Sequence, residues 1–513
     1  MKRIVTEERL AKIFCAFSSL LFAVLFCLSL VETWINDYDL IEEYVSPVGD
    51  SIVWNLVLLC LFALGALLVY RWQNAGKPKW NMDLIAGIVS VLAGIFCIYW
   101  VGAVDAAPQA DQFYICSQAE AFENGNYEGL HLGQYAGLFR HQLGQITFLR
   151  LLFKVFGNGN YQAFQYLNAL MVPVLIYSGY EIVKRLSDKK RIVAGLYLFL
   201  MGTCVPLYGY VPFVYGEMIS TALTMFAAWM FLWALERFSW VKVLLLSIAL
   251  GAAVQFRKNT LIFIIAFVIV AGIRLCRGWN WRIPVILGSI LLSILLFQTY
   301  INVTYEKLIP EDSQAVPSVV YIAMGVNDDN GRAGWHNYYD QLAMAENDYD
   351  VEKTKQAVKE YLKEFWETNK DNPAYLADFY YRKLASQWNA PMYQCFAMNN
   401  NFAEEPKGLA KQVYFGNLRG FLEAEMNLHQ LVVYGAVLSL LLIIRKKWHQ
   451  IENYLLLIGV FGGFLFSMMW EAKTRYVFPY YLAMLPYAAV GIYELLKWLN
   501  KKYEEIFGKD TTL

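Results

Sequence analysis

The chain has 513 residues and no formal net charge; 58% of its residues are hydrophobic, 16% are aromatic and only 17% are charged. Soluble domains carry about 25% charged residues, and about 20 consecutive apolar residues are enough to span a bilayer. Apolar runs of that length recur from residues 13–31 to the C-terminal region. The composition therefore excludes a soluble protein, offers no basic excess for a nucleic-acid partner, and predicts a multi-pass membrane protein surrounded by lipids.

Basic residues cluster in alternate loops, around residues 71–79, 184–191, 274–282 and 445–447, and again in the tail at 497–509. The loops between them, at 32–50, 105–160 and 302–428, are acidic or long. Because Lys and Arg near span ends are retained in the cytoplasm, we expect both termini to be cytoplasmic and the long loops to lie outside. The first apolar run lacks a small-residue cleavage site, so we expect it to be retained as an anchor.

The segment 240–274 lies between two basic loops. It is too long for one membrane span and rather short for two full spans. We expect two short helices that turn at Gln255–Asn259, which places Arg257 and Lys258 at the outer surface. The total is about twelve spans in an all-α polytopic fold. The expected units are two N-terminal spans in 1–81, a membrane core in 82–302 with its first outer loop at 105–160, a mainly helical extracytoplasmic module in 303–428, and the last spans with a cytoplasmic tail in 429–513.

Two outer segments show helical periodicity. The first outer loop has apolar residues that predict two amphipathic helices at the membrane interface: Phe113, Ile115, Ala119 and Phe122, then Leu143, Ile146, Leu149 and Leu152. In the outer module the pattern predicts one helix over Val351–Asn369. Asn372 is placed to cap a second helix that begins at Pro373.

Two acids follow the third span. Asp105 ends that span, and Asp111 opens the first amphipathic helix. A carboxylate in this place is suited to act as a general base towards a hydroxyl nucleophile. The alternatives are a helix N-cap for Asp111 and a solvated span terminus for Asp105.

Cations recur near the outer ends of spans. Arg140 and His141 flank an apolar helix at the depth of a lipid phosphate, which arginine donors fit well; snorkelling to headgroups is the alternative. Lys473 and Arg475 lie in a short outer turn, against the usual charge bias. Such a pair of cations indicates a bound anion.

Two further acids accompany these cations. Glu217 lies near the outer end of an apolar span, where a carboxylate usually faces a partner or a cavity, and Arg257 or Lys258 is a candidate partner. Glu471 precedes Lys473 and Arg475, and a structural ion pair with either is the alternative to a bound anion. The outer face thus offers one carboxylate pair and three separate cationic spots, which suits a reaction at a lipid-linked phosphate and also suits an anion transporter.

The order of these motifs resembles the GT-C superfamily of membrane glycosyltransferases, especially its protein-mannosyltransferase and aminoarabinose-transferase branch. The likeness extends from about Met82 to Gly491 and depends on the order of short motifs. The segments that look like the family's motifs are Asp111–Tyr114 for the acidic motif after a span, Phe139–Gly144 for the basic motif, Val155–Gly157 for the Phe-Gly close, and Glu471–Tyr476 with Pro479 for the C-terminal ending.

The resemblance implies a GT-C-like bundle and an inverting, hexosyltransferase-like enzyme in a bacterial cell membrane. It would move a sugar from a polyprenyl-phosphate donor to an envelope polysaccharide, lipid or protein acceptor on the extracytoplasmic face, with Asp111 as the catalytic base. The other implied site residues are Arg140, His141, Arg257, Lys258, Lys473 and Arg475 for the donor phosphate, Asp105, Glu217 and Glu471 in support, and Trp335, His336, Trp388 and Asn389 for the acceptor. For the acceptor residues, a buried aromatic core is the alternative.

Two features depart from the family pattern. Gln112 stands where a second acid is usual, and two extra spans precede the span that leads to Asp111. The first departure disfavours a two-carboxylate metal site, so we expect no cofactor; His131, His141 and Glu120 keep a divalent metal open.

The leading alternative function is a flippase or carrier for an anionic lipid-linked glycan, which would use the same cations. The large one-sided outer module and the lack of paired repeats count against it. A purely structural envelope-assembly subunit explains neither the cations in outer turns nor Glu217.

Overall fold

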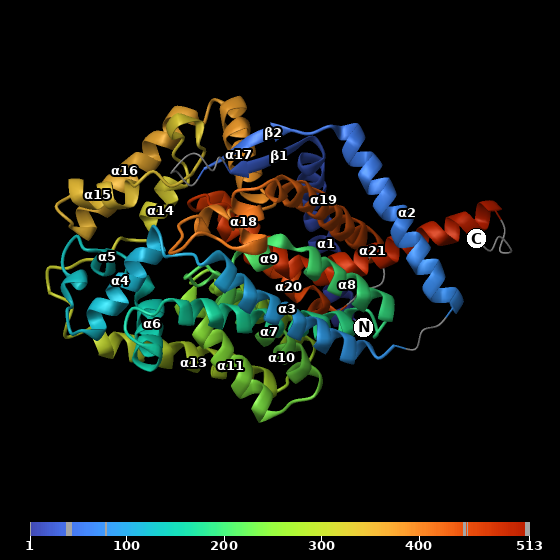
Figure 1. Ribbon diagram of the computed structural model, residues 1–513, viewed down its shortest axis with the longest axis horizontal. Coiled ribbons are helices and arrows are strands. Elements are labelled where there is room, and N and C mark those ends of the chain that lie inside the picture. The colour runs from blue at the N-terminus through green and yellow to red at the C-terminus, as the bar shows by residue number, and fades with distance from the viewer. Residues whose placement is uncertain (1, 37–43, 77–79, 445–447, 449, 508–513) are drawn as a thin grey trace.

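The computed structural model describes residues 2–36, 44–76, 80–444, 448 and 450–507. In these residues ten helices are long and apolar enough to cross a membrane, and two shorter helices, α8 (Arg191–Thr203) and α11 (Trp240–Phe256), are also apolar. This confirms an all-α polytopic membrane protein. The ten long helices are α1 (Lys2–Val31), α2 (Ile52–Gly76), α3 (Met82–Val104), α7 (Gln162–Leu186), α10 (Glu217–Glu236), α12 (Thr260–Arg277), α13 (Arg282–Tyr305), α19 (Leu418–Ile444), α20 (Leu455–Met469) and α21 (Phe478–Phe507) (Figure 1).

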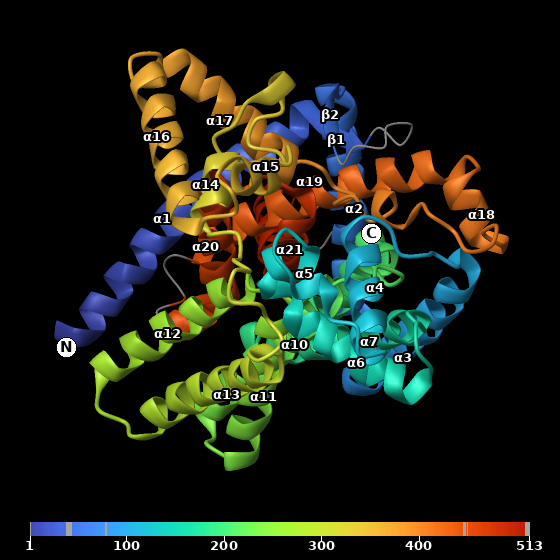
Figure 2. The ribbon, with the colours of Figure 1, turned by 90° about the vertical axis from the view of Figure 1, so that its left-hand side faces the viewer.

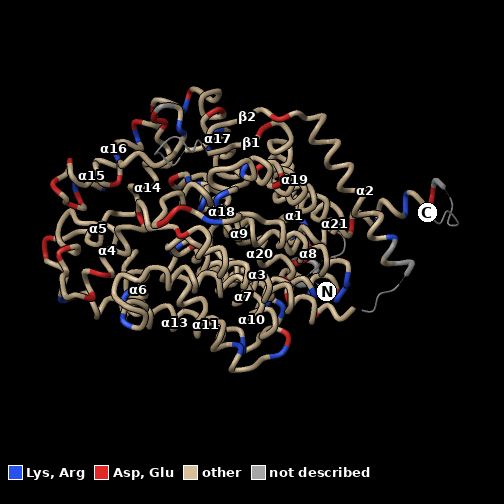
Figure 3. Tube along the Cα trace, in the orientation of Figure 1, with Lys and Arg blue, Asp and Glu red and all other residues tan. Residues whose placement is uncertain are grey.

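The basic residues at 77–79, 445–447 and 509, which contributed to the expected topology, lie outside the described residues. In Figure 1 the N- and C-terminal ends lie towards the right of the bundle. The helices of the first outer loop and the first helices of the outer module lie at its left end, and the last helices of that module lie nearer its middle. Figure 2 looks onto that left end, with these helices in front of the bundle. Charged residues gather at the ends and in the loops, while the helices between them are largely uncharged (Figure 3). This distribution is that of a chain whose middle faces lipid.

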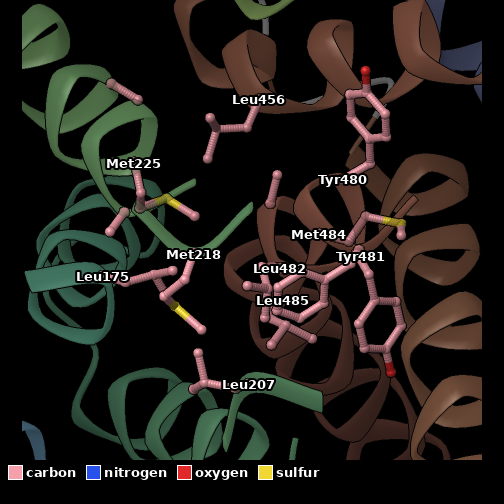
Figure 4. Packing of buried hydrophobic residues seen from close by; sticks show 14 of the residues in the cluster. Leu175, Leu207, Met218, Met225, Leu456, Tyr480, Tyr481, Leu482, Met484 and Leu485 are labelled. Atoms are coloured by element: carbon pink, nitrogen blue, oxygen red, sulfur yellow. The ribbon is translucent and has the colours of Figure 1, made fainter. Parts of the chain in front are cut away.

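The long helices pack in pairs, chiefly α10 with α11, α19 with α21, and α3 with α7. At the centre, Leu175 of α7 and Met218 of α10 face Leu482 and Leu485 of α21 (Figure 4). Because lipid is as apolar as these side chains, close packing rather than release of water joins such helices. Gly491 of α21 shows how close the packing is, since a Cβ there would clash with the carbonyl of Ala436 in α19.

The outer end is built from short helices. The first outer loop contributes α4 (Asp111–Glu123), α5 (Tyr135–Leu138) and α6 (Leu143–Phe156). The outer module contributes α14 (Val319–Met324), α15 (Tyr339–Glu346), α16 (Val351–Asn369), α17 (Pro373–Trp388) and α18 (Gly408–Tyr414). These two segments, far apart in the chain, meet: Gln109 Nε2 donates to Ala397 O at 2.8 Å, and Ala106 forms a β-bridge with Phe402. The contacts enclose the start of α4.

Several sequence predictions are confirmed. α16 has the predicted bounds, and α17 begins at Pro373, with Asn372 Oδ1 accepting from Tyr375 N at 3.1 Å. The two helices predicted in 240–274 are α11 and α12, separated by residues 257–259. Phe113 does not share the face of the other apolar residues predicted for α4: it is exposed, because it lies two residues from the buried Ile115 and therefore on the opposite side of the helix.

One element was not predicted from the sequence. Between α1 and α2, the strands β1 (Glu32–Asn36) and β2 (Val45–Gly49) form an antiparallel pair in which Trp34 opposes Pro47. The hairpin is tied to the outer module, because Trp34 N donates to Asn389 O at 2.9 Å at the end of α17.

Candidate active site

Asp111 is the first residue of α4, and its carboxylate accepts three hydrogen bonds. Arg475 Nη2 donates at 3.1 Å, Tyr135 Oη at 3.3 Å and Tyr215 Oη at 3.4 Å. The N-cap of α4 is Ala110, so Asp111 does not serve as the cap. Its side chain remains 35% exposed, whereas that of Arg475 is 3% exposed. The carboxylate is thus held in place and still open to a ligand.

The charge state of Asp111 follows from its surroundings. Burial raises the pKa of this carboxyl, but the positive charges of Arg475 and Lys473 and the hydrogen bond from Arg475 outweigh burial and lower the pKa below its usual value. The N-terminus of α4 adds a favourable dipole for a negative charge. Asp111 is therefore a carboxylate at neutral pH and can accept a proton.

Arg475 and Arg257 both lie close to the same two tyrosine rings. The guanidinium of Arg257 is 5.0 Å from the Tyr215 ring centroid and 5.3 Å from that of Tyr476; for Arg475 the distances are 5.3 and 5.8 Å. Both arginines line a pocket between α10, α12, α20 and α21 together with Glu217. Glu217 Oε1 lies 3.4 Å from Arg257 Nη2. The pocket therefore holds both arginines, and Asp111 lies beside it in contact with Arg475.

The outer turn between α20 and α21 holds a second cluster. Glu471 is buried; its Oε1 lies 3.6 Å from Lys473 Nζ and 3.4 Å from His336 Nδ1, and its Oε2 accepts from Tyr476 Oη at 3.1 Å. Burial raises the pKa of Glu471, but the charge of Lys473 and the contact with His336 outweigh it and lower the pKa to about 2. The structural pair of Glu471 with Lys473 is thus present.

Ion pairs, the alternative to a bound anion, are present at three of the predicted phosphate-binding cations. Their carboxylate partners are Asp111 for Arg475, Glu217 for Arg257, and Glu471 for Lys473. Buried charges without a partner are too costly to keep. An anion that binds one of these cations must share it with an acid.

The other three predicted phosphate ligands have different surroundings. Arg140 donates to the carbonyl of Ser313, and Lys258 Nζ donates to the amide oxygens of Gln255 and Gln298. Among the described residues, no carboxylate lies within 4.0 Å of either cation. His141 is exposed, and its ring lies edge-on to that of Tyr321 at 6.4 Å.

Most of the predicted acceptor residues lie inside the protein. Trp335 Nε1 donates to Ser386 Oγ, and Trp388 Nε1 donates to Ser467 Oγ, both at 2.9 Å. Asn389 is 1% exposed and donates to Glu32 O at 2.7 Å. Their polar atoms are used by the protein, so the structure places these three in the core, and only His336 of the predicted set lies beside the site.

Asp105 lies apart from Asp111. Its Oδ1 accepts from Gln162 Nε2 at 2.9 Å, and its backbone ends α3 in the left-handed region, with φ of 49°. Asp105 therefore ends the span α3, as in the alternative given above, and does not support the site.

The sequence did not single out two tyrosines that contact Asp111, Tyr135 and Tyr215. Tyr215 links the carboxylate further, since Gln142 Nε2 donates to its hydroxyl. Nothing in the sequence distinguishes these two among 35 tyrosines. Within the residues that the structure describes, no group of three or more His, Cys, Asp or Glu is placed to hold a metal ion.

No protein-family model and no curated protein matches this chain. Among solved structures it is similar to the archaeal oligosaccharyltransferase AglB from Archaeoglobus fulgidus in complex with an inhibitory peptide and a dolichol-phosphate, with a TM-score of 0.39 and 12% identity over 85% of this chain and 53% of that one. It is also similar to the oligosaccharyltransferase of the same organism, tethered with an acceptor peptide containing the NVT sequon. Here the TM-score is 0.40 and the identity 13%, over 86% of this chain and 53% of that one. This chain therefore spans about half of their length, and at these TM-scores the likeness carries no argument about it.

Proposed function

We propose that this protein is a GT-C-like glycosyltransferase that moves a sugar from a polyprenyl-phosphate donor to a glycan, lipid or protein acceptor. One observation carries the proposal: the partly open carboxylate of Asp111 is joined through Arg475 to a pocket at the ends of α10, α12 and α21 that also holds Arg257. With both termini in the cytoplasm of a bacterial cell, this end of the bundle faces outwards.

In this reaction Asp111 accepts the proton of an acceptor hydroxyl as its oxygen forms a bond to the anomeric carbon of the sugar. The bond from that carbon to the phosphate oxygen breaks on the opposite side, so the configuration inverts and polyprenyl phosphate leaves. The arginines and lysines named above supply positive charge for the phosphate that gains charge as it leaves, and such preorganised charge stabilises the transition state. Glu217 and Glu471 support the reaction by holding Arg257 and Lys473 in position.

Binding of the donor also prepares the base. The negative charge of a bound donor phosphate opposes the positive charges that lower the pKa of Asp111. The pKa of Asp111 then rises, which makes the carboxylate a stronger base only when the donor is in place.

The test uses purified protein in lipid nanodiscs with radiolabelled polyprenyl-phosphate sugars and candidate acceptors. Asp111→Asn keeps the size of the side chain and removes the base, so we expect transfer to fall by about 10²- to 10⁴-fold. Asp105→Asn is the matched control and keeps wild-type activity. Movement of intact lipid-linked sugar between leaflets, without bond cleavage and unchanged in Asp111→Asn, would refute the enzyme and favour a carrier.

A further inference from the structure

The cations of the site differ in what neutralises them, and Lys258 stands out. Arg257, Arg475 and Lys473 each contact a carboxylate, whereas Lys258 Nζ meets only two amide oxygens, Gln255 Oε1 at 3.4 Å and Gln298 Oε1 at 3.3 Å. No carboxylate among the described residues lies within 4.0 Å of it. The charge of Lys258 is therefore available to an anion without competition from an acid.

Gln255, beside Lys258, has a hydrogen-bond donor without an acceptor. Its side chain is 6% exposed, and its Nε2 has no partner in the structure. Lys258 sets the orientation of the Gln255 amide. Its ammonium donates to Oε1, and if the amide were flipped, the NH₂ group would be a second donor facing the ammonium. A buried donor without an acceptor destabilises a protein by about 1–3 kcal/mol. A ligand that accepts a hydrogen bond from Gln255 Nε2 would remove this cost.

The position of Gln255 is fixed by close packing. A Cβ on Gly144, near the start of α6, would meet Gln255 O at 2.6 Å and Gln255 Cβ at 2.9 Å. The residue therefore cannot withdraw towards α6, and its free N–H stays next to the ammonium of Lys258. Lys258 Nζ and Gln255 Nε2 are thus two hydrogen-bond donors without a neighbouring carboxylate. Such a pair suits an anion, because the oxygens of an anion accept hydrogen bonds and donate none.

The surroundings indicate where the anion comes from. Lys258 lies in the turn between α11 and α12 and contacts Gln298 of α13. Leu295 and Leu291, three and seven residues before Gln298 and therefore on the same side of α13, are exposed apolar residues. An anion bound at this turn can thus carry a hydrocarbon chain that lies along α13 in the lipid.

We propose that Lys258 and Gln255 form an anion site that takes the phosphate of the lipid-linked donor. The inference rests on the proposed function and narrows it, because it assigns the phosphate to one of the six cations. Binding there displaces none of the three ion pairs. Arg257, the preceding residue in the chain, lines the neighbouring pocket.

The test measures binding of polyprenyl phosphate to the full-length protein in nanodiscs of zwitterionic lipid. Because hydrogen bonds to charged groups are the strong ones, we expect Lys258→Met to raise the Kd by about 10- to 100-fold. Gln255→Leu removes one donor, and we expect a rise of about 3- to 10-fold. Lys258→Arg keeps the charge and restores most of the affinity. Lys307→Met is the matched control, since Lys307 is exposed near the outer end of α13, and it leaves the Kd unchanged.

Two further probes distinguish the sources of the phosphate. We expect inorganic phosphate to compete weakly, with the same dependence on Lys258, because it lacks the chain that lies along α13. Phosphatidylglycerol that binds as tightly as polyprenyl phosphate would overturn the assignment to the donor, and an unchanged Kd in both Lys258→Met and Gln255→Leu would overturn the site.

The test of phosphate binding and the test of sugar transfer can fail independently of each other. Asp111→Asn, which we expect to be inactive, binds polyprenyl phosphate like the wild type if the site is as proposed. Binding that depends on Lys258 in a protein that transfers no sugar supports the site and refutes the transferase. Transfer with an unchanged donor KM in Lys258→Met supports the transferase and refutes the site.

Discussion

Gln112, next to the proposed base, uses both ends of its side-chain amide. Nε2 donates to Met398 O at 2.8 Å, and Oε1 accepts from Val214 N at 2.7 Å. The side chain is buried. It joins α4 to the outer module on one side and, on the other, to the segment that precedes α10. A carboxylate cannot replace it, because it has no donor for Met398 O. The departure from the family's acidic pattern at this position is therefore a structural requirement of this chain.

We expect Gln112→Glu to lower the free energy of unfolding by about 3 kcal/mol, since it leaves the Met398 carbonyl unpaired and buries a charge. Gln112→Met, which loses both hydrogen bonds but adds no charge, should cost less. Thermal unfolding of the purified variants, followed by tryptophan fluorescence, measures the difference. Equal melting temperatures for Gln112→Glu and the wild type would show that the amide is not needed.

Glu471 gives a pH-dependent prediction. Its pKa is lowered to about 2 in the folded protein from the ordinary value of 4.5. A lowered pKa means that the carboxylate stabilises the fold fully above pH 4.5 and that this contribution disappears as the pH falls towards 2. The charged or titratable groups around it are Lys473, His336, Arg475, Tyr476, Asp340 and Lys383.

We expect Glu471→Gln to lower the free energy of unfolding by about 3 kcal/mol at pH 7, because Lys473 then stays buried without its acid. The difference from the wild type should shrink between pH 4.5 and pH 2, as the wild-type carboxylate takes up a proton. Denaturant unfolding over this pH range measures it. A difference that stays constant with pH would show that the ion pair is not its cause.

At the scale of elements, helix α17 holds several parts of the outer end together. Lys383 Nζ donates to Met468 O at 3.1 Å, and Trp388 Nε1 donates to Ser467 Oγ at 2.9 Å, so both bind the end of α20. Asn389 binds the start of β1. The turn that carries Glu471 and Arg475 begins directly after α20, and its position therefore depends on α17.

Asn389→Ala separates this structural role from acceptor binding. It removes the part-buried bond to Glu32 O and the buried bond from Ser29 Oγ, and we expect a loss of about 2 kcal/mol in the free energy of unfolding. Because the side chain does not reach the site, the acceptor KM should remain that of the wild type. A raised acceptor KM with unchanged stability would restore the role expected from the sequence.

The sequence predicted helices where the signal is local. The Asn372–Pro373 start of α17 and the turn at 257–259 rest on caps, breakers and span length, which neighbouring residues determine. The ion pairs are different, since Asp111 meets Arg475 across 364 positions of the chain. The residue types indicated acids and cations at the outer end, but which acid neutralises which cation is decided by tertiary packing and was not readable.

At the scale of the whole molecule, the two ends of the bundle differ. The end with α4 and the outer module carries the candidate site, and the chain termini lie at the other (Figure 1). One crossing by each of the ten long and two short apolar helices would return the chain to the side on which it began. The orientation of the protein in the membrane therefore decides on which side a sugar donor must be presented.

Single cysteines in a background without the eight natural ones determine this orientation. Glu360 is exposed on α16 at the outer module, and Lys190 is exposed in the basic turn between α7 and α8. Lys and Arg near span ends stay in the cytoplasm, so we expect a membrane-impermeant maleimide to label Glu360→Cys in intact cells and Lys190→Cys only after permeabilisation. Neither side chain touches the candidate site, so both variants should keep activity. Labelling in the reverse order would place Asp111 in the cytoplasm, where the donor phosphate would have to be presented from the inner leaflet.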